Sequence, residues 1–272
     1  MKAEETRVPA PGRLLAGRRA LITGGVGAIG RAVAERMAWH GAEVVVADLE
    51  EEPAAQVAGD LSERHGCRAL GIGVDVVDLE GLEAAADRVE RELGSVNVVV
   101  ANAGVLTSEA ALDMDLDRWK RVIDVNLTGA FLTAAVFARR MRADELGGSI
   151  IFSSSLFGLR GGRGNTAYSA SKFGIIGMAQ SLAAELAADG IRVNSVCPGQ
   201  VESAMLTDLF VRRAEQNGSS VTEEQTRFVE RIPVGRLGSI EEIADSFVYL
   251  ASDLASYVTG HALLVDGGWQ VG

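Results

Sequence analysis

The stretch "RALITGGVGAIG", Arg19–Gly30, joins an apolar strand-like run to a cluster of glycines and then to the start of a helical pattern. Gly25, Gly27 and Gly30 spell GxGxxG, the fingerprint of dinucleotide-binding folds. A turn of this kind between a strand and a helix aims backbone N–H groups at a diphosphate. The stretch therefore predicts a nucleotide-binding turn after the first strand of an α/β sheet.

The same stretch also fits a second glycine pattern. Thr23, Gly24 and Gly30 match TGxxxGxG, provided that Ala28 takes the place of its middle glycine. Both patterns place a tight turn between a strand and a helix, so these residues alone do not decide between them. The choice depends on the rest of the chain.

Apolar runs of strand length alternate with segments of helical period along the whole chain. Strands are expected at 19–24, 43–48, 68–76, 96–104, 148–154, 191–197 and 262–268, and helices at 28–40, 53–65, 79–93, 115–142, 165–188 and 240–251. Alternation of this kind is typical of a parallel sheet covered on both faces. We therefore predict an α/β fold, a single Rossmann-type doubly wound sheet of about seven strands with helices on both faces.

The chain shows no internal repeat and no linker between domains. Residues 1–16, with two prolines and mixed charge, are expected to form a flexible N-terminal extension. Residues 17–272 then form one dinucleotide-binding and catalytic domain. Residues 205–232 add no strand and follow a strand end, which favours a substrate lid over ordinary surface structure.

Composition limits the partners and the compartment. The 272 residues carry a net charge of -11, which argues against nucleic acid and anionic membranes because phosphate binding needs clustered cations. Cys67 and Cys197 form no CxxC pair, and the start of the chain lacks an apolar secretion signal, so a cytoplasmic protein is expected. The histidines are scattered without ligand spacing, so no metal site is expected.

An acidic residue follows the glycine cluster at the end of the next strand. Asp48 lies eighteen residues after Gly30, where a carboxylate can accept hydrogen bonds from the adenosine ribose hydroxyls. It would repel a 2′-phosphate, and neither Gly27 nor Leu49 supplies a cation to bind one. The pattern favours NAD over NADP, although a strand-end or helix-cap carboxylate is the alternative interpretation of Asp48.

Tyr168 and Lys172 form a candidate catalytic pair. Among the three tyrosines only Tyr168 has a lysine four residues on, a spacing that places both side chains on one helix face. A free phenol titrates near pH 10, and an ammonium about 4 Å away supplies up to about 4 kcal/mol of attraction to the phenolate. The alternative is a surface cation beside a half-buried ring.

With these motifs the chain resembles the classical short-chain dehydrogenase/reductase family over residues 18–269. The family's Tyr-x-x-x-Lys matches Tyr168 and Lys172, its serine thirteen residues upstream falls on Ser155, and "DVNLTG" places its asparagine at Asn126. The resemblance implies that Tyr168 exchanges a proton with the substrate oxygen while Ser155 stabilises charge there. It further implies that Lys172 lowers the tyrosine pKa and holds the nicotinamide ribose, and that Asn126 positions a water.

The resemblance also selects the TGxxxGxG pattern and extends the cofactor site. "ANAG" departs from the family at Ala101, "VD" and the next valine resemble the adenine contact, and "CPGQVES" has Ser203 where threonine is usual. The expected cofactor-binding residues are Gly24, Gly27, Ile29, Gly30, Asp48, Leu49, Asp75, Val76, Asn102, Ala103, Gly104, Tyr168, Lys172, Pro198, Gly199, Val201 and Ser203.

These features predict an NAD-dependent oxidoreductase that interconverts a secondary alcohol and a ketone. The alternative is a catalytically silent NAD-binding regulatory protein of the same fold; an enoyl-thioester reductase is a third, whose members separate tyrosine and lysine more widely. The resemblance also implies a homotetramer. The substrate stays open between a polyol, a cyclic alcohol and a hydroxyacyl thioester, bordered by Leu106, Leu156, Phe157, Arg160, Gln200 and the predicted lid.

Overall fold

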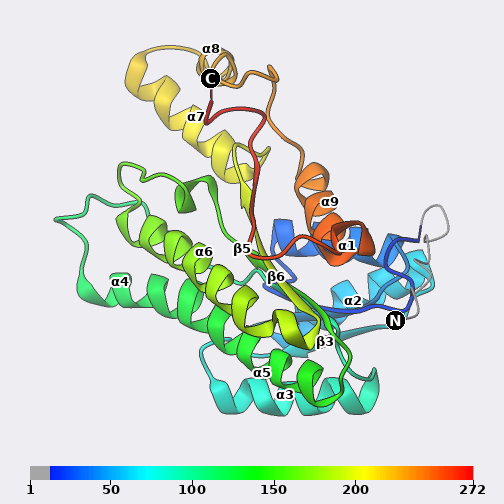
Figure 1. The fold of residues 1–272 in the computed structure, drawn as a ribbon. Coiled ribbons are helices and arrows are strands. Elements are labelled where there is room, and N and C mark those ends of the chain that lie inside the picture. The colour runs from blue at the N-terminus through cyan, green and yellow to red at the C-terminus, as the bar shows by residue number, and fades with distance from the viewer. Residues whose placement is uncertain (1–12, 272) are drawn as a thin grey trace.

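The computed structural model describes residues 13–271 and contains one parallel sheet of seven strands (Figure 1). Their order across the sheet is β3-β2-β1-β4-β5-β6-β7. The fold class predicted from the sequence is confirmed. The strands are β1 (Arg19–Thr23), β2 (Glu43–Asp48), β3 (Ala69–Gly73), β4 (Val98–Ala101), β5 (Gly148–Ser153), β6 (Ile191–Pro198) and β7 (Ala262–Val265).

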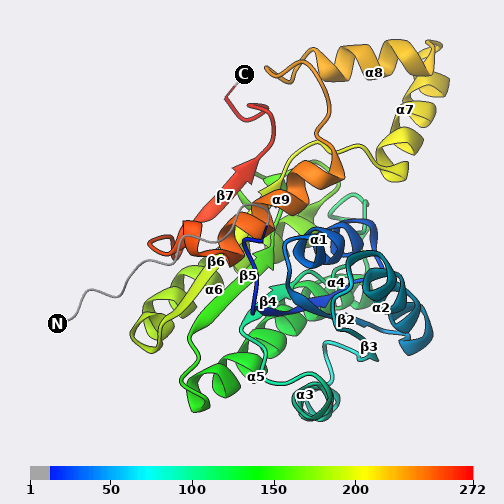
Figure 2. The same ribbon diagram turned by 90° about the vertical axis from the view of Figure 1, so that its right-hand side faces the viewer.

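Helices cover both faces of the sheet (Figures 1 and 2). The face with α1, α2 and α9 and the face with α3, α5 and α6 each enclose an apolar core against the strands. The helices are α1 (Ala28–Trp39), α2 (Glu51–His65), α3 (Leu79–Glu92), α4 (Leu116–Ile123), α5 (Gly129–Ala143), α6 (Thr166–Leu186), α7 (Ala204–Asn217), α8 (Val221–Val229) and α9 (Ile240–Ala251). β4 is apolar throughout and β2 is apolar at its four inner positions, because both faces of these strands are buried.

The strand order reverses between β1 and β4. From β1 the chain proceeds outward to β2 and β3, then returns to pair β4 with β1 on the other side. Ligands of open α/β sheets bind at the carboxyl ends of the strands at such a switch point. This arrangement places the glycine turn after β1 beside the segment that follows β4.

The long helix expected at 115–142 differs from its prediction. It is a continuous run of α4, a π-helical turn at Asp124–Thr128 and α5. The sequence pattern predicted the run and not the π turn, because apolar periodicity does not register one additional residue in a turn. Single π turns of this type are frequent at functional sites.

This helical run, Leu116–Ala143, is long and apolar enough by length and composition to cross a membrane. Half of its most apolar window is buried within the fold. Core helices pass the same test, so the run is weak evidence for a membrane span.

The folded region begins earlier than expected. Residues 1–12 of the predicted extension lie outside the described residues, but Leu15 is fully buried and its N–H donates to the His40 carbonyl. Its side chain belongs to the core between the sheet and α1. The predicted boundary at residue 16 was therefore wrong for Arg13–Ala16; the adjacent pair Leu14 and Leu15 is too short to give a periodic signal.

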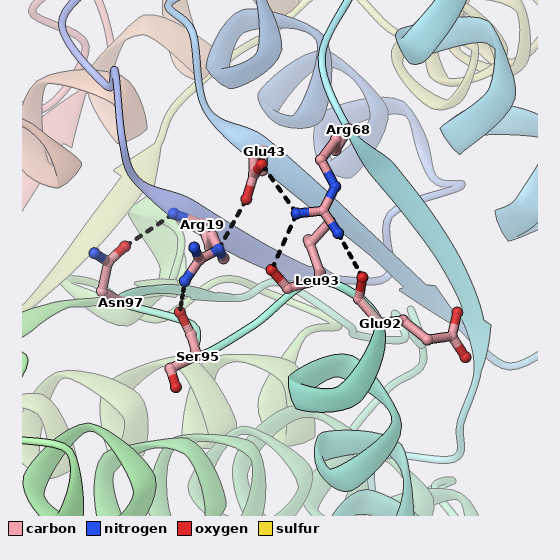
Figure 3. Close-up of polar contacts among 7 residues, drawn as sticks. All are labelled: Arg19, Glu43, Arg68, Glu92, Leu93, Ser95 and Asn97. Carbon is pink, nitrogen blue, oxygen red and sulfur yellow. Dashed lines mark hydrogen bonds and ion pairs between the residues drawn. The ribbon is translucent and has the colours of Figure 1, made fainter.

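A polar network holds the opposite edge of the sheet (Figure 3). Glu43 at the start of β2 accepts from Arg19 Nε at 2.8 Å and from Arg68 at 3.4 Å. Arg19 also donates to the Ser95 carbonyl, and its N–H donates to Asn97 Oδ1 at 2.9 Å. This network joins β1, β2 and the segment before β4 at their amino ends, far along the strands from the glycine turn.

Residues 205–232 form most of α7, a turn and α8, which stand above the carboxyl ends of the central strands (Figure 1). They pack on their own apolar cluster, here called the α7–α8 cluster, rather than on the cores of the sheet. Its buried members are Leu156, Leu206, Phe210, Phe228, Ile232, Leu237 and Trp269. The position is the one expected of a lid, and that role stays a prediction.

Candidate active site

The geometry of the glycine turn distinguishes the two glycine patterns. Gly24 has a φ of +63°, and a Cβ on Gly30 would lie 2.1 Å from the Gly24 carbonyl oxygen. Gly27 has a φ of −65°, and a Cβ there would meet nothing closer than 3.4 Å. Ala28 occurs where α1 begins. The turn thus needs glycine at 24, which only TGxxxGxG contains, and at 30, which both patterns share. Of the GxGxxG glycines, Gly25 is also crowded, since a Cβ there would lie 2.7 Å from Val46 Cγ1, whereas Gly27 is not sterically required.

The amino end of α1 is suited to a diphosphate. The first α1 hydrogen bond at this end runs from the Arg31 N–H to the Gly27 carbonyl, so the N–H groups of residues 28–30 have no acceptor within the helix. Gly27 caps the helix without a side chain, and the first turn has no acidic residue. Uncapped N–H groups and the helix dipole together favour an anion at this end.

Asn102 connects this turn to the end of β4. Its N–H and that of Ala103 donate to the Thr23 hydroxyl at 3.0 and 3.2 Å. Its carboxamide donates to the carbonyls of Thr23 and Gly24 at 3.1 and 3.2 Å. The expected cofactor residue Asn102 therefore braces the glycine turn with its side chain.

The Asp48 carboxylate lies at the end of β2 and faces the same turn. Oδ2 accepts the Val26 N–H at 2.9 Å, and Oδ1 accepts the Leu49 N–H at 2.8 Å. Leu49 is 66% exposed. The carboxylate is thus fixed beside the turn, where its charge faces the place expected for the ribose, and it also stabilises the turn.

The other expected cofactor residues lie along the same edge of the sheet. Asp75 is exposed, and its carboxylate accepts the Val77 N–H. Val76 is buried against Gly129, where an added Cβ would lie 2.6 Å from the Val76 Cγ2 atom. Pro198 ends β6, Val201 forms an isolated bridge with Gly238, and a Cβ on Gly199 would meet Asp266. Ser203 is exposed and caps α7 by accepting the Leu206 N–H.

Tyr168 and Lys172 lie one turn apart near the start of α6, as their spacing predicts. Lys172 is 4% exposed; its Nζ donates to the Ser153 carbonyl at 2.7 Å and lies 5.4 Å from the centre of the Tyr168 ring. The ring of Phe157 meets Tyr168 edge-on, with centroids 6.4 Å apart. The structure thus brings the predicted pair together and fixes the ammonium with a buried carbonyl.

The three consecutive serines after β5 make different contacts. Ser153 accepts from Lys172 through its carbonyl, and the Ser154 hydroxyl donates to the Lys172 carbonyl at 3.0 Å. The Ser155 hydroxyl accepts the Phe157 N–H and is the hydrogen-bond partner of the Tyr168 phenol. Ser155 is therefore the serine beside the phenol. The hydrogen bonds of Ser153 and Ser154 to Lys172 were not predicted from the sequence. The run of three serines at the end of a strand was the available signal for them.

Burial shifts the pKa values of the pair in opposite directions. It raises the pKa of Tyr168, and the hydrogen bond with Ser155 opposes that rise. It lowers the pKa of Lys172 from 10.5 to about 8. The expected lowering of the tyrosine pKa by the ammonium is not seen in the protein alone, because desolvation disfavours both charged forms.

Asn126 is fully buried in the π turn. Its Oδ1 accepts the Val105 N–H at 2.7 Å, and its Nδ2 donates to the Val105 carbonyl and to the Ser171 hydroxyl. A Cβ on Gly104 would lie 3.2 Å from Asn126 Oδ1 and 3.7 Å from Lys172 Nζ. Asn126 thus joins the segment after β4 to α6, close to the ammonium.

No cluster of three or more potential metal ligands occurs among residues 13–271. The structure gathers Ser155, Tyr168, Lys172 and Asn126 near the carboxyl ends of the strands, and their catalytic roles stay predictions. Together they offer a phenol as proton donor or acceptor, a hydroxyl for an oxyanion and a buried ammonium.

Comparison with known proteins links this geometry to enzymes. A family model described as enoyl-(acyl carrier protein) reductase matches residues 25–270. The chain is 36% identical over 254 residues to 3-oxoacyl-[acyl-carrier-protein] reductase FabG of Aquifex aeolicus, covering 93% of this chain and 98% of that protein. It is 38% identical to cis-4-hydroxycyclohexanecarboxylate dehydrogenase of Sinomonas cyclohexanicum, covering 95% and 98%.

A solved structure has the same fold. The short-chain type dehydrogenase/reductase from Mycobacterium marinum superposes with a TM-score of 0.84 and is 35% identical, covering 95% of this chain and 97% of that one.

The glycine turn yields a paired test. Gly30→Ala forces a Cβ against the Gly24 carbonyl, so we expect a loss of about 1–3 kcal/mol in the free energy of unfolding and weakened nicotinamide dinucleotide binding. Gly27→Ala should cost less than about 1 kcal/mol, because its backbone suits alanine and only the cap changes. Urea unfolding and calorimetric titration measure both, and equal losses in the two variants would contradict the assigned pattern.

The buried ammonium predicts a pH-dependent stability. Unfolding restores the Lys172 pKa to 10.5 from about 8, so the unfolded chain binds more protons between these pH values and the folded chain gains stability as pH rises. Relative to Lys172→Met, the free energy of unfolding of the wild-type chain should rise by about 3 kcal/mol from pH 8 to 10.5. Below pH 8 the wild-type chain should lack this whole contribution to its stability. Urea unfolding without cofactor measures this difference, and a constant difference across that range would refute it.

Proposed function

Because this chain belongs to the short-chain dehydrogenase/reductase family, we propose that it is an NAD-dependent dehydrogenase interconverting a secondary alcohol and a ketone. The chain is an oxidoreductase of this family, which uses nicotinamide cofactors. The choice of NAD and the substrate class are our proposals. The observation that carries the proposed reaction is the placement of Ser155, Tyr168 and Lys172 together at the carboxyl ends of the strands, whereas the proposed choice of NAD rests on Asp48.

In this proposal the nicotinamide cofactor, when bound, exchanges hydride with the substrate carbon. Tyr168 exchanges a proton with the substrate oxygen, and the Ser155 hydroxyl donates a hydrogen bond to that oxygen as charge develops. Lys172, held by the Ser153 carbonyl, stabilises the phenolate and would contact the ribose. Asn126 holds the Val105 segment and positions a water beside the ammonium.

Two sets of residues support the cofactor assignment. The uncapped amino end of α1 and the close approach of Gly24 and Gly30 suit a diphosphate. The Asp48 carboxylate beside the turn favours ribose hydroxyls and disfavours a 2′-phosphate, which supports NAD over NADP.

The relatives' names describe different substrates. One acts on a 3-oxoacyl group attached to acyl carrier protein and another on a cyclic hydroxy acid. Both names describe chemistry at a hydroxyl or oxo group, which supports carbonyl chemistry here. The family model is described as an enoyl reductase, an enzyme that reduces a carbon–carbon double bond. Tyr168 and Lys172 are four residues apart, and this spacing favours reaction at a carbonyl group.

We propose a cytoplasmic homotetramer whose ligands are small molecules. The resemblance places the subunit contacts on the two long helices and the C-terminal strand. Apolar side chains are exposed there: Phe131 on α5, Phe173 on α6, and Leu254 and Tyr257 before β7. The net charge of -11 disfavours nucleic acid and anionic membranes as partners.

Tyr168→Phe tests the proposed reaction. Removing the phenol hydroxyl should lower kcat by at least about 10²-fold, because no other group supplies the proton, while NAD binding persists. Nicotinamide absorbance over a panel of sugar alcohols, cyclic alcohols, ketones and 3-oxoacyl thioesters measures turnover, and calorimetry measures binding. Tyr249→Phe, on α9, is the matched control. Undiminished activity in Tyr168→Phe would overturn the assignment, and an inactive wild-type protein would favour the regulatory alternative.

Asp48→Ala tests the cofactor choice. We expect the ratio of kcat/KM for NAD over NADP to fall by about tenfold or more. The variant loses a charge-assisted hydrogen bond to the ribose of NAD, and it also loses the repulsion between the carboxylate and the 2′-phosphate of NADP. Asp48→Asn keeps an uncharged acceptor for the Val26 N–H and separates turn support from charge. Glu63→Ala removes an exposed carboxylate on α2 as the control. An unchanged ratio in both Asp48 variants would show that the carboxylate does not select the cofactor.

A further inference from the structure

The hydroxyl of Ser171 lies between two of the candidate catalytic residues. Ser171 is fully buried on α6, one residue before Lys172. Its hydroxyl donates to the Tyr168 carbonyl at 2.7 Å and accepts from Asn126 Nδ2 at 3.2 Å. A hydroxyl has one proton, so donation to the carbonyl leaves the oxygen as the acceptor for the carboxamide. One side chain therefore connects Asn126 of the π turn to the turn of α6 that carries Tyr168.

The Asn126 carboxamide is engaged on two sides. Toward the segment after β4, its Oδ1 accepts the Val105 N–H at 2.7 Å and its Nδ2 donates to the Val105 carbonyl at 2.9 Å. Toward α6, the second proton of Nδ2 goes to the Ser171 oxygen. Ser171 is thus the group through which this carboxamide is bonded to α6.

The π turn and α6 pack closely around this hydrogen bond. Both Asn126 and Ser171 are fully buried. A Cβ on Gly174, three residues after Ser171, would lie 2.8 Å from Leu127 Cδ2, so the glycine permits the close approach of the two segments. Water cannot replace a partner lost in such a place, and a buried donor without an acceptor is costly. The bond therefore constrains the position of the π turn on α6.

The position of Asn126 matters because its amide oxygen lies near the Lys172 ammonium. A Cβ on Gly104 would lie 3.2 Å from Asn126 Oδ1 and 3.7 Å from Lys172 Nζ, so both atoms border the same point. The ammonium is fixed separately, by the Ser153 carbonyl at 2.7 Å. A displacement of the π turn along α6 would move the amide oxygen away from this point and leave the ammonium in place.

Ser181 on the same helix shows what a helical serine does without such a contact. Its hydroxyl donates to the Gly177 carbonyl at 3.2 Å, and the residue is exposed. Hydrogen bonds of this kind are local and commonly serve the helix alone. Ser171 differs because it is buried and because it also accepts from Asn126. The contact with the π turn is therefore the feature that distinguishes Ser171.

We propose that Ser171 is a positioning residue of the reaction, whose hydroxyl holds Asn126 in place relative to Tyr168 and Lys172. It acts through Asn126 and not on the substrate. The inference rests on the proposed dehydrogenase function, because it concerns the geometry of the same residues. Loss of the hydroxyl should therefore affect the chemical step more than the binding of substrate or cofactor.

Ser171→Ala and Ser181→Ala form the matched pair for the test. Ser171→Ala should lower kcat about tenfold, because Asn126 loses its hydrogen bond to α6, and should change KM and calorimetric NAD binding little. Ser181→Ala removes a hydroxyl that bonds within the helix and should keep the wild-type kcat. Ser171→Thr keeps the hydroxyl and should recover part of the loss. Nicotinamide absorbance with the best substrate of the panel measures turnover.

A second measurement repeats the substitution in a chain that lacks the Asn126 carboxamide. In an Asn126→Leu background, Ser171→Ala should lower kcat by less than about twofold, because the contact through which it acts has already been removed. An equal loss in both backgrounds would show a general effect on packing and overturn the inference. Circular dichroism checks folding, and Ser171→Cys, close to serine in size, replaces the alanine variant if that variant does not fold.

The outcomes separate this inference from the proposed function. Wild-type kcat in Ser171→Ala, together with loss of activity in Tyr168→Phe, would overturn the role of Ser171 and leave the dehydrogenase function intact. A wild-type protein that turns over no alcohol or ketone would overturn the proposed function and this inference with it.

Discussion

The contact on which the site depends lies at the carboxyl ends of the neighbouring strands β1 and β4, where the strand order reverses. Thr23 and Asn102 exchange hydrogen bonds there through both side chains and backbone, and the Gly24 carbonyl fits against Gly30 with no room for a Cβ. The turn, the first helix and the segment after β4 are consequently held as one unit. The candidate catalytic residues of the π turn, of the segment after β5 and of α6 lie at the same carboxyl ends of the strands, where the strand order reverses.

Most of the fold could be predicted because its signals are local and repeated. Continuous apolar runs such as "VVVA" marked the doubly buried strands, and the helical period marked α1, α2 and α9 close to their true ends. Leu15 and the π turn at Asn126 could not be predicted, since each depends on a tertiary contact and adds no periodicity. The site residues were placed by spacing and resemblance, whereas the bracing by Asn102 and Ser154 required the three-dimensional arrangement.

The electrostatic prediction for Tyr168 and Lys172 differed from the structure for a physical reason. Spacing along the sequence indicates the attraction between an ammonium and a phenolate at short range, whereas the desolvation of each group depends on the folded surroundings. Burial favours the neutral phenol and the neutral amine together, and the ammonium is stabilised by the Ser153 carbonyl. The proton affinity of the pair is therefore set by how the surrounding strands exclude water as much as by the two side chains.

The apolar residues beneath α7 and α8 form a cluster separate from the two cores that enclose the sheet. The cluster still touches the sheet at one place, because Leu264 of β7 packs against it. A change of volume inside the cluster would therefore act on β7 and on Leu156, the residue after Ser155, while the two cores that enclose the sheet keep their own packing.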